Sequence, residues 1–198
     1  MTLTRKGQAT RDRILQSAAE LIAARGVAGT STEDVRRAAG VSGSQLYHYF
    51  DSKQALIRAV IARQSEEPPV PGQPIMGALD SYDALRAWCE AAIEHLDEQG
   101  VCSLASLAGE LTASDEETRE DLYQAFLRWQ ELISNGLRAM RERGELRADA
   151  DLDELALALL TAWQGGVVLA QTMRSSEPLK ASFTAALAYV RSFITVTL

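Results

Sequence analysis

The stretch TSTEDVRRAAGVSGSQLYHYFDSK, residues 30–53, decides the fold class of this chain. Ser31 is a good N-cap for a helix, Asp34 places a carboxylate in its first turn, and Gly40 supplies its end. After a short turn, a second helix over about residues 42–50 is dense in hydroxyl, amide and aromatic groups. Two helices joined by so tight a turn can present the second one to the major groove of DNA. The stretch therefore predicts a DNA-binding regulator.

Apolar residues recur at helical spacing on both sides of this stretch. The expected helices are 8–25 before it, a fourth helix capped by Asp51 and Ser52, and then 81–98, 103–113, 115–143, 151–175 and 178–196. Four prolines in residues 66–77 exclude regular helix there and predict a connector. We therefore expect an all-α fold of about nine helices, with a DNA-binding domain at 1–63 and a ligand-binding and dimerisation bundle at 64–198.

The charges divide unevenly along the chain, although the net charge of −7 is unusual for a DNA-binding protein. Residues 1–63 hold ten Lys and Arg against five Asp and Glu, a balance of +5, which leaves −12 for residues 64–198. Duplex DNA attracts the basic part and repels the acidic part. The division predicts that only the N-terminal part faces DNA.

Composition disfavours several other classes of protein. The start of the chain is basic and lacks the apolar run of a signal peptide. The longest apolar stretch, 155–170, is interrupted by Thr161 and Gln164 and falls short of the roughly 20 residues that span a bilayer, so we expect a buried or interface helix. Cys89 and Cys102 have no CxxC spacing and only two histidines occur, so neither a disulfide framework nor a metal or cofactor site is indicated. We expect a cytoplasmic protein without membrane contact.

The helix-turn-helix resembles a known family. The residues that carry the resemblance are Thr30, Ser31, Val35, Ala39, Gly40, Val41, Ser42, Leu46, Tyr47, Tyr49, Phe50 and Lys53, with Thr10, Arg11, Ile14, Leu15, Ala18, Ala19, Arg25 and Gly26 upstream. Their spacing is similar to the DNA-binding module of the TetR family of transcriptional regulators over about residues 8–60, and the later helices match in number and order. The resemblance implies a homodimeric repressor that binds a palindromic operator and is released by a small hydrophobic effector.

The expected DNA contacts lie on the third helix and beside it. They are Arg36, Ser42, Gly43, Ser44, Gln45, Tyr47, His48, Tyr49 and Lys53. On the first turns of the third helix, the serine hydroxyls can donate or accept hydrogen bonds with base edges. Gly43 allows close approach of the helix to DNA, and Gln45 can form two hydrogen bonds with adenine. By the resemblance, Tyr47, Tyr49 and Lys53 grip the DNA backbone. Plainer alternatives stay open, because either tyrosine could be a packing residue, His48 an ordinary surface histidine and Ser42 a helix cap.

Arg36 departs from the family pattern, which has alanine four residues before the turn glycine. That position normally packs the second helix against the third, where a large side chain is bulky. We expect the stem of Arg36 to lie along the surface with its guanidinium outward, within reach of phosphate. The alternative is that Arg36 disturbs the helix pair and weakens DNA binding.

The predicted effector site lies among aromatic residues of the C-terminal helices. The expected lining residues are Trp88, Cys89, Leu104, Leu107, Phe126, Trp129 and Trp163, with His95, Gln130 and Gln164 as further polar candidates. Clustered aromatics with few charges nearby can line an apolar cavity for a flat or hydrophobic compound. The alternative is that these side chains simply fill the core.

The last two helices are expected to form the homodimer contact. The helix over 151–175 has almost no polar face, and a helix that is apolar all round is buried on all sides. The expected interface residues are Ala158, Ala162, Gly165, Gly166, Leu169, Ala185 and Tyr189. A four-helix contact between two copies would set two recognition helices about 34 Å apart, one turn of DNA. A purely intrachain core is the alternative.

Two further functions are weighed against this one. A redox-sensing regulator would use Cys89 and Cys102, although neither has a basic neighbour in sequence to activate it. A helical enzyme would use His95 with Glu90, Glu94, Glu98 or Glu110, a pattern more typical of a solvated helix surface.

Overall fold

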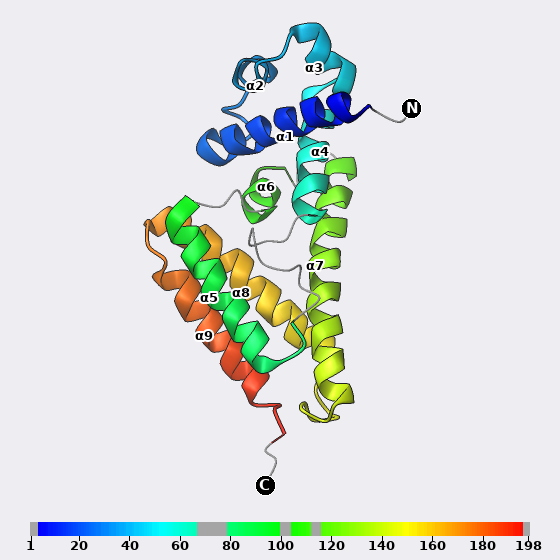
Figure 1. Ribbon diagram of the computed structural model, residues 1–198. Helices are drawn as coiled ribbons and strands as arrows, with labels where there is room; N and C mark the ends of the chain where they lie inside the picture. The colour runs from blue at the N-terminus through cyan, green and yellow to red at the C-terminus, as the bar shows by residue number, and fades with distance from the viewer. Residues whose placement is uncertain (1–3, 67–78, 100–103, 112–115, 196–198) are drawn as a thin grey trace.

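Nine helices form the described part of the chain, which in this computed structural model comprises residues 4–66, 79–99, 104–111 and 116–195 (Figure 1). They are α1 (Arg5–Arg25), α2 (Thr32–Ala39), α3 (Gly43–Tyr49), α4 (Lys53–Glu66), α5 (Tyr82–Gln99), α6 (Leu104–Leu111), α7 (Glu116–Glu142), α8 (Leu152–Met173) and α9 (Glu177–Arg191). Within these residues the only β-type pairing is an isolated bridge between Leu146 and Ile194. The predicted all-α fold is confirmed. The proposed connector at 66–77 lies outside the described residues except for Glu66, which ends α4.

The ends of the helix-turn-helix are set by the caps that the sequence predicts. The Ser31 hydroxyl accepts from the Asp34 amide while the Asp34 carboxylate accepts from the Ser31 amide, so a capping box starts α2. Gly40 ends α2 in the left-handed region, with φ of 61°. Ser42 and Gln45 form a second capping box that starts α3. These local contacts explain why the helix boundaries could be read from the sequence.

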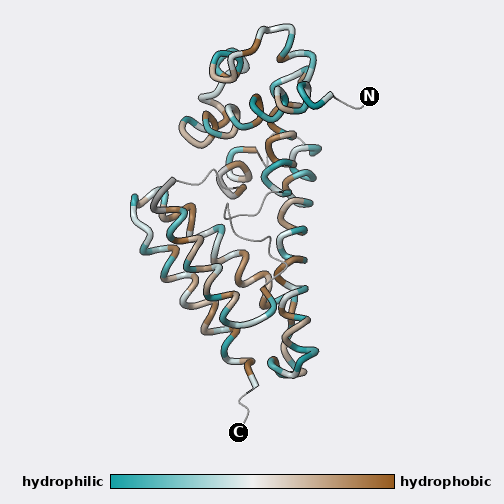
Figure 2. The backbone as a smooth tube through the Cα atoms, in the orientation of Figure 1, coloured by the Kyte–Doolittle hydropathy of each residue, from teal (hydrophilic) through white to brown (hydrophobic). Residues whose placement is uncertain are grey.

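Two hydrophobic cores divide the chain into a head and a body. The head core is formed by Ile14, Leu15, Ala18, Val35, Ala39, Val41, Leu46, Phe50, Leu56 and Val60. The body core gathers the apolar faces of α5–α9 and also includes Ile22 of α1 and Val27 of the turn after α1. Hydrophobic and hydrophilic residues alternate along the helices (Figure 2), as expected for helices with one buried face.

Helix α4 belongs to both cores. Leu56 and Val60 are buried in the head core, whereas Ile57 and Ile61, one residue further along, are buried in the body core. In Figure 1, α4 descends from the head, and it packs along α7. A displacement of α4 would therefore be felt in both parts of the chain.

Helix α8 is not buried on all sides within the single chain, which leaves the predicted homodimer contact untested. By length and composition alone, this helix of 22 residues could cross a membrane. One of its faces, however, packs into the body core. Leu157, Val168, Leu169 and Met173 of the same helix remain exposed. The uniform hydrophobicity of α8 thus combines a core face with apolar residues that the single chain leaves uncovered.

Candidate nucleic-acid interface

One face of α3 is exposed and polar. Ser44, Gln45, Tyr47 and His48 are exposed on it, with 57% of Tyr47 accessible, while Leu46 on the opposite side is buried. A Cβ added at Gly43 would meet nothing within 4 Å, so the first turn of α3 is open to an approaching molecule. The face carries hydroxyl, amide and imidazole groups, the types that read base edges in the major groove.

The first turn of α3 is pre-organised by its own polar residues. Gln45 Oε1 accepts from the Ser42 amide at 2.9 Å, and Ser42 Oγ accepts from the Gln45 amide at 3.2 Å. The hydroxyls of Ser42 and Ser44 are 3.0 Å apart. Ser42 is therefore a helix cap, the plainer of its two sequence interpretations. An adenine contact by Gln45 remains a prediction and would compete with this cap.

The two tyrosines of α3 differ in burial. Tyr47 projects into solvent, whereas Tyr49 is half-buried against the head core and meets the ring of His48 edge-on, with centroids 5.0 Å apart. Packing thus accounts for part of the role of Tyr49. Contacts of either tyrosine with the DNA backbone remain predictions.

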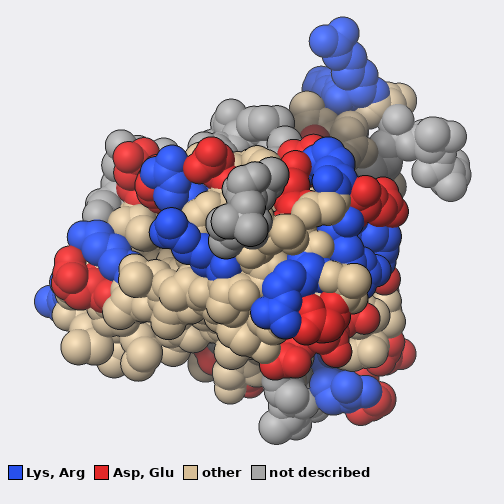
Figure 3. All heavy atoms as spheres, turned by 90° about the horizontal axis from the view of Figure 1, so that it is seen from below, with Lys and Arg blue, Asp and Glu red and all other residues tan. Residues whose placement is uncertain are grey.

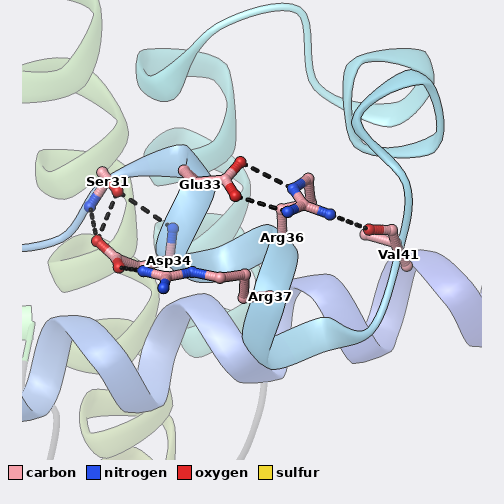
Figure 4. Close-up of polar contacts among 6 residues, drawn as sticks. All are labelled: Ser31, Glu33, Asp34, Arg36, Arg37 and Val41. Atoms are coloured by element: carbon pink, nitrogen blue, oxygen red, sulfur yellow. Dashed lines mark hydrogen bonds and ion pairs between the residues drawn. The ribbon is translucent and has the colours of Figure 1, made fainter.

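Arg36 lies on the surface as expected, but its guanidinium is occupied within the head (Figure 4). It forms an ion pair with Glu33, with Nη2 2.6 Å from Oε1, and Nη1 donates to the Val41 carbonyl at 3.3 Å. Ala39 and Val41 keep their places in the head core. The large side chain is accommodated without displacing the packed residues between α2 and α3.

Lys53 also has an internal partner. Its ammonium donates to the Val27 carbonyl at 2.7 Å, across the turn that joins α1 to α2. A phosphate contact by Lys53 remains a prediction, and it would require this hydrogen bond to be shared or broken.

The same turn is held from the body by Glu110 of α6. Its Oε2 accepts from the Val27 amide at 2.8 Å and from the Ala28 amide at 3.4 Å. The Glu110 carboxylate from the body therefore binds the Val27 amide, and the Lys53 ammonium from α4 binds the Val27 carbonyl. The sequence pattern offers Glu110 only as a remote acid–base candidate, because a separation of 83 residues gives no local signal of this contact.

A second link joins α4 to α7. The Arg58 guanidinium pairs with Glu117 and with Asp121, whose Oδ2 is 2.5 Å from Nε. Further along, Arg128 Nη2 donates to Ser65 Oγ at 2.5 Å. Arg58 is one of the ten basic residues counted in the N-terminal part, and here it is paired with acids of the body.

Charge on the body is mixed in sign. Seen from the end opposite the head (Figure 3), basic and acidic side chains intermingle around a broad uncharged area. Arg143 pairs with Glu145, and Arg147 with Asp149. This face of the described chain offers DNA no extended basic surface, in agreement with the acidic charge predicted for the body.

All seven predicted effector-site residues come together in the body core, six of them buried and Phe126 packed against them. The rings of Trp129 and Trp163 stack with centroids 4.8 Å apart, and Trp88 meets Trp163 edge-on at 5.1 Å. Trp88 is 4% exposed, and its indole Nε1 has no hydrogen-bond partner among the described residues. Gln164 Oε1 is likewise buried without a described partner. The body therefore contains one buried donor and one buried acceptor that have no partner among the described residues.

Burial of Cys89 disfavours the redox alternative. Cys89 is 2% exposed, and burial raises the pKa of its thiol to about 12, so the reactive thiolate is disfavoured. Cys102 lies outside the described residues. Across the part of the chain that the structure describes, no three His, Cys, Asp or Glu side chains gather as a metal site would require.

The predicted dimer residues are divided between two environments. Gly165, Leu169 and Ala185 are exposed, Ala158, Ala162 and Tyr189 are partly buried, and Gly166 is buried. A Cβ on Gly166 would lie 2.6 Å from Ser182 Oγ and 2.7 Å from Leu179 Cδ1, so this glycine serves the close approach of α8 and α9 within one chain. Tyr189 donates its hydroxyl to Glu154 at 2.6 Å. The exposed apolar residues Leu157, Val168 and Met173 of α8 are not among the predicted interface residues.

Comparison with known proteins agrees with this arrangement. Residues 14–60 match the model of the bacterial regulatory proteins of the tetR family, and residues 81–186 match the tetracyclin repressor-like C-terminal domain. The HTH-type transcriptional repressor DhaR of Mycobacterium sp. (strain GP1) is 28% identical over 180 residues, which cover 85% of this chain and 86% of that protein. The HTH-type transcriptional repressor KstR2 of Rhodococcus jostii is 30% identical over 158 residues, which cover 77% and 76%.

A solved structure extends the match to the whole fold. A TetR transcriptional regulator from Chloroflexus aurantiacus superposes with a TM-score of 0.78 at 26% identity, covering 98% of this chain and 100% of that one. The exposed face of α3, the helical body and these matches lead to one conclusion: the chain belongs to the tetR family of bacterial regulatory proteins and is a DNA-binding transcriptional regulator.

Proposed function

We propose that this regulator is a repressor that binds a palindromic operator as a homodimer and leaves it when a small, largely apolar effector enters the body. The observation that carries the proposal is the exposed polar face of α3 on a head that polar contacts fasten to the body. Both DhaR and KstR2 are named as repressors, which supports the same outcome here. Its place of action is the cytoplasm, where its DNA partner lies, and its role is regulatory rather than enzymatic.

The homodimer is proposed to form through α8 and α9. Leu157, Val168 and Leu169 expose an apolar strip on α8, and Gly165 leaves it open because a Cβ there would meet nothing within 4 Å. Apolar strips of this kind mark protein–protein contacts. Pairing two copies across a two-fold axis would cover both strips and present two α3 helices to successive major grooves.

The effector is proposed to bind beside the tryptophan cluster. An unsatisfied buried polar group costs about 1–3 kcal/mol, so the Trp88 N–H favours a compound that brings an acceptor. Gln164 Oε1 favours a donor on the same compound. A flat ring bearing a hydroxyl or carbonyl group would satisfy these requirements and pack against the aromatic faces.

Release is proposed to pass through α4 and the turn after α1. Glu110 binds that turn from α6, and Arg58 ties α4 to α7, so a shift of α6 or α7 would move the head. An effector changes DNA affinity only if it binds more tightly to the shifted arrangement. These links, together with the Arg128–Ser65 hydrogen bond, are polar contacts through which such a shift could be transmitted.

The proposal is tested by selection of DNA duplexes from a random-sequence library with the purified chain. We expect enrichment of an inverted repeat with half-sites about 10 base pairs apart, and affinity that falls steeply with salt. Enrichment of no sequence, or binding indifferent to salt, would reject the operator-binding part of the proposal.

A further inference from the structure

Arg36 closes the turn between α2 and α3 from both sides. Its backbone carbonyl accepts from the Val41 amide at 3.2 Å, and its guanidinium donates to the Val41 carbonyl at 3.3 Å. Val41 is the buried residue of the turn, and the next residue, Ser42, caps α3. The path of the chain through Val41 therefore sets the direction in which α3 leaves the turn.

Glu33 holds the guanidinium in this position. Arg36 Nε lies 2.8 Å from Glu33 Oε2, and Nη2 lies 2.6 Å from Oε1, a bidentate arrangement that fixes the plane of the guanidinium. The third nitrogen, Nη1, is then aimed at Val41 (Figure 4). The Arg36 side chain is 33% exposed, less than the 58% of Glu33.

The pairing also removes the charge that a DNA contact would use. Glu33 neutralises Arg36, and Asp34 pairs with Arg37 on the same helix with a 2.5 Å contact. Hydrogen bonding to Arg36 lowers the pKa of Glu33, so this carboxylate stays ionised at neutral pH. A phosphate that approached Arg36 would be repelled by the negative charge of Glu33 beside it.

We propose that Arg36 is a positioning residue that, locked by Glu33, braces the α2–α3 turn through the Val41 carbonyl and so orients the recognition helix, rather than a contact to the DNA backbone. The inference rests on the DNA-binding role of the head. It explains how the chain tolerates arginine at a position between two closely packed helices. The bidentate pair and the turn carbonyl together require a planar guanidinium, which lysine cannot supply.

The brace and the phosphate contact predict opposite effects for Glu33→Gln. If Arg36 braces the turn, the weakened pair should loosen α3 and lower the affinity for the selected duplex about three- to tenfold, in the range expected of one such polar contact. If Arg36 contacts phosphate, the same change frees its guanidinium, removes a negative charge and raises the affinity. Glu20→Gln, the same charge change on α1, is the matched control and should leave the affinity near that of the wild type.

Two Arg36 variants supply an independent readout. Under the brace, Arg36→Lys should lose as much affinity as Arg36→Ala, and both should keep the wild-type slope of log affinity against log salt. A phosphate contact predicts that Arg36→Lys retains affinity and that Arg36→Ala lowers the slope by about 0.9. Circular dichroism tests whether each variant is folded. If an Arg36 variant is unfolded, Glu33→Gln still tests the inference, because glutamine has nearly the same shape as glutamate. Tighter binding by Glu33→Gln would overturn the inference, whereas failure of the wild type to select any duplex would instead overturn the operator proposal.

Discussion

Removal of the Glu110 carboxylate should loosen the turn that joins α1 to α2. In Glu110→Ala, the Val27 amide loses a 2.8 Å hydrogen bond and the Ala28 amide loses a longer one of 3.4 Å. Hydrogen bonds to a charged group contribute about 1.5–3 kcal/mol, but Glu110 is exposed and water can replace it. We therefore expect about 1 kcal/mol of local stability to be lost, which corresponds to roughly a fivefold change in an opening equilibrium.

Amide hydrogen exchange at Val27 measures this change directly. We expect exchange about fivefold faster in Glu110→Ala, with a smaller acceleration in Glu110→Gln, because a neutral amide oxygen still accepts a hydrogen bond. Glu131→Ala removes an exposed carboxylate from α7 and serves as the control. Unchanged exchange at Val27 in Glu110→Ala, or equal acceleration in the control, would refute the assignment of Glu110 as a link between body and head.

Two further substitutions test the packing of α8. Gly166→Ala should lower the free energy of unfolding by about 1–2 kcal/mol, because its Cβ would meet Ser182 and Leu179 at under 3 Å. The control Gly109→Ala should not lower it, because a Cβ there would meet nothing within 4 Å. Equal denaturation midpoints for the two variants would contradict the close approach of α8 and α9. Leu169→Glu places a charge on the exposed strip and should raise the dimer dissociation constant at least 100-fold in light-scattering measurements, whereas Tyr123→Glu on α7 should leave it unchanged. A Leu169→Glu dimer as stable as the wild type would place the homodimer contact elsewhere.

Local signals account for what the sequence predicted well. Ser31, Gly40 and Ser42 act within a few residues of themselves, so the boundaries of α2 and α3 follow from cap chemistry alone. The apolar periodicity of the later helices gave their order and approximate ends. An amphipathic pattern indicates which residues of a helix are buried, and this can be predicted without knowing which helix packs against them.

Contacts between distant segments account for what the sequence could not predict. Glu110 and Val27 are 83 residues apart, and no periodicity marks either of them as a partner of the other. Gly166 carried the signal of a small residue at a helix contact, but that signal does not say whether the facing helix belongs to the same chain. The position of the Arg36 guanidinium depends on both Glu33 and Val41. The sequence alone does not show that these two residues lie close enough to bind it at the same time.

We propose above all the recognition of a defined DNA duplex by the exposed face of α3, presented twice by a homodimer. Its most direct test is fluorescence anisotropy of the selected inverted repeat against a scrambled duplex of the same composition, as a function of salt. We predict that two chains bind each repeat, with at least 10³-fold preference over the scrambled duplex and a steep loss of affinity with salt. Equal affinity for the two duplexes, or one chain bound per repeat at saturation, would contradict it.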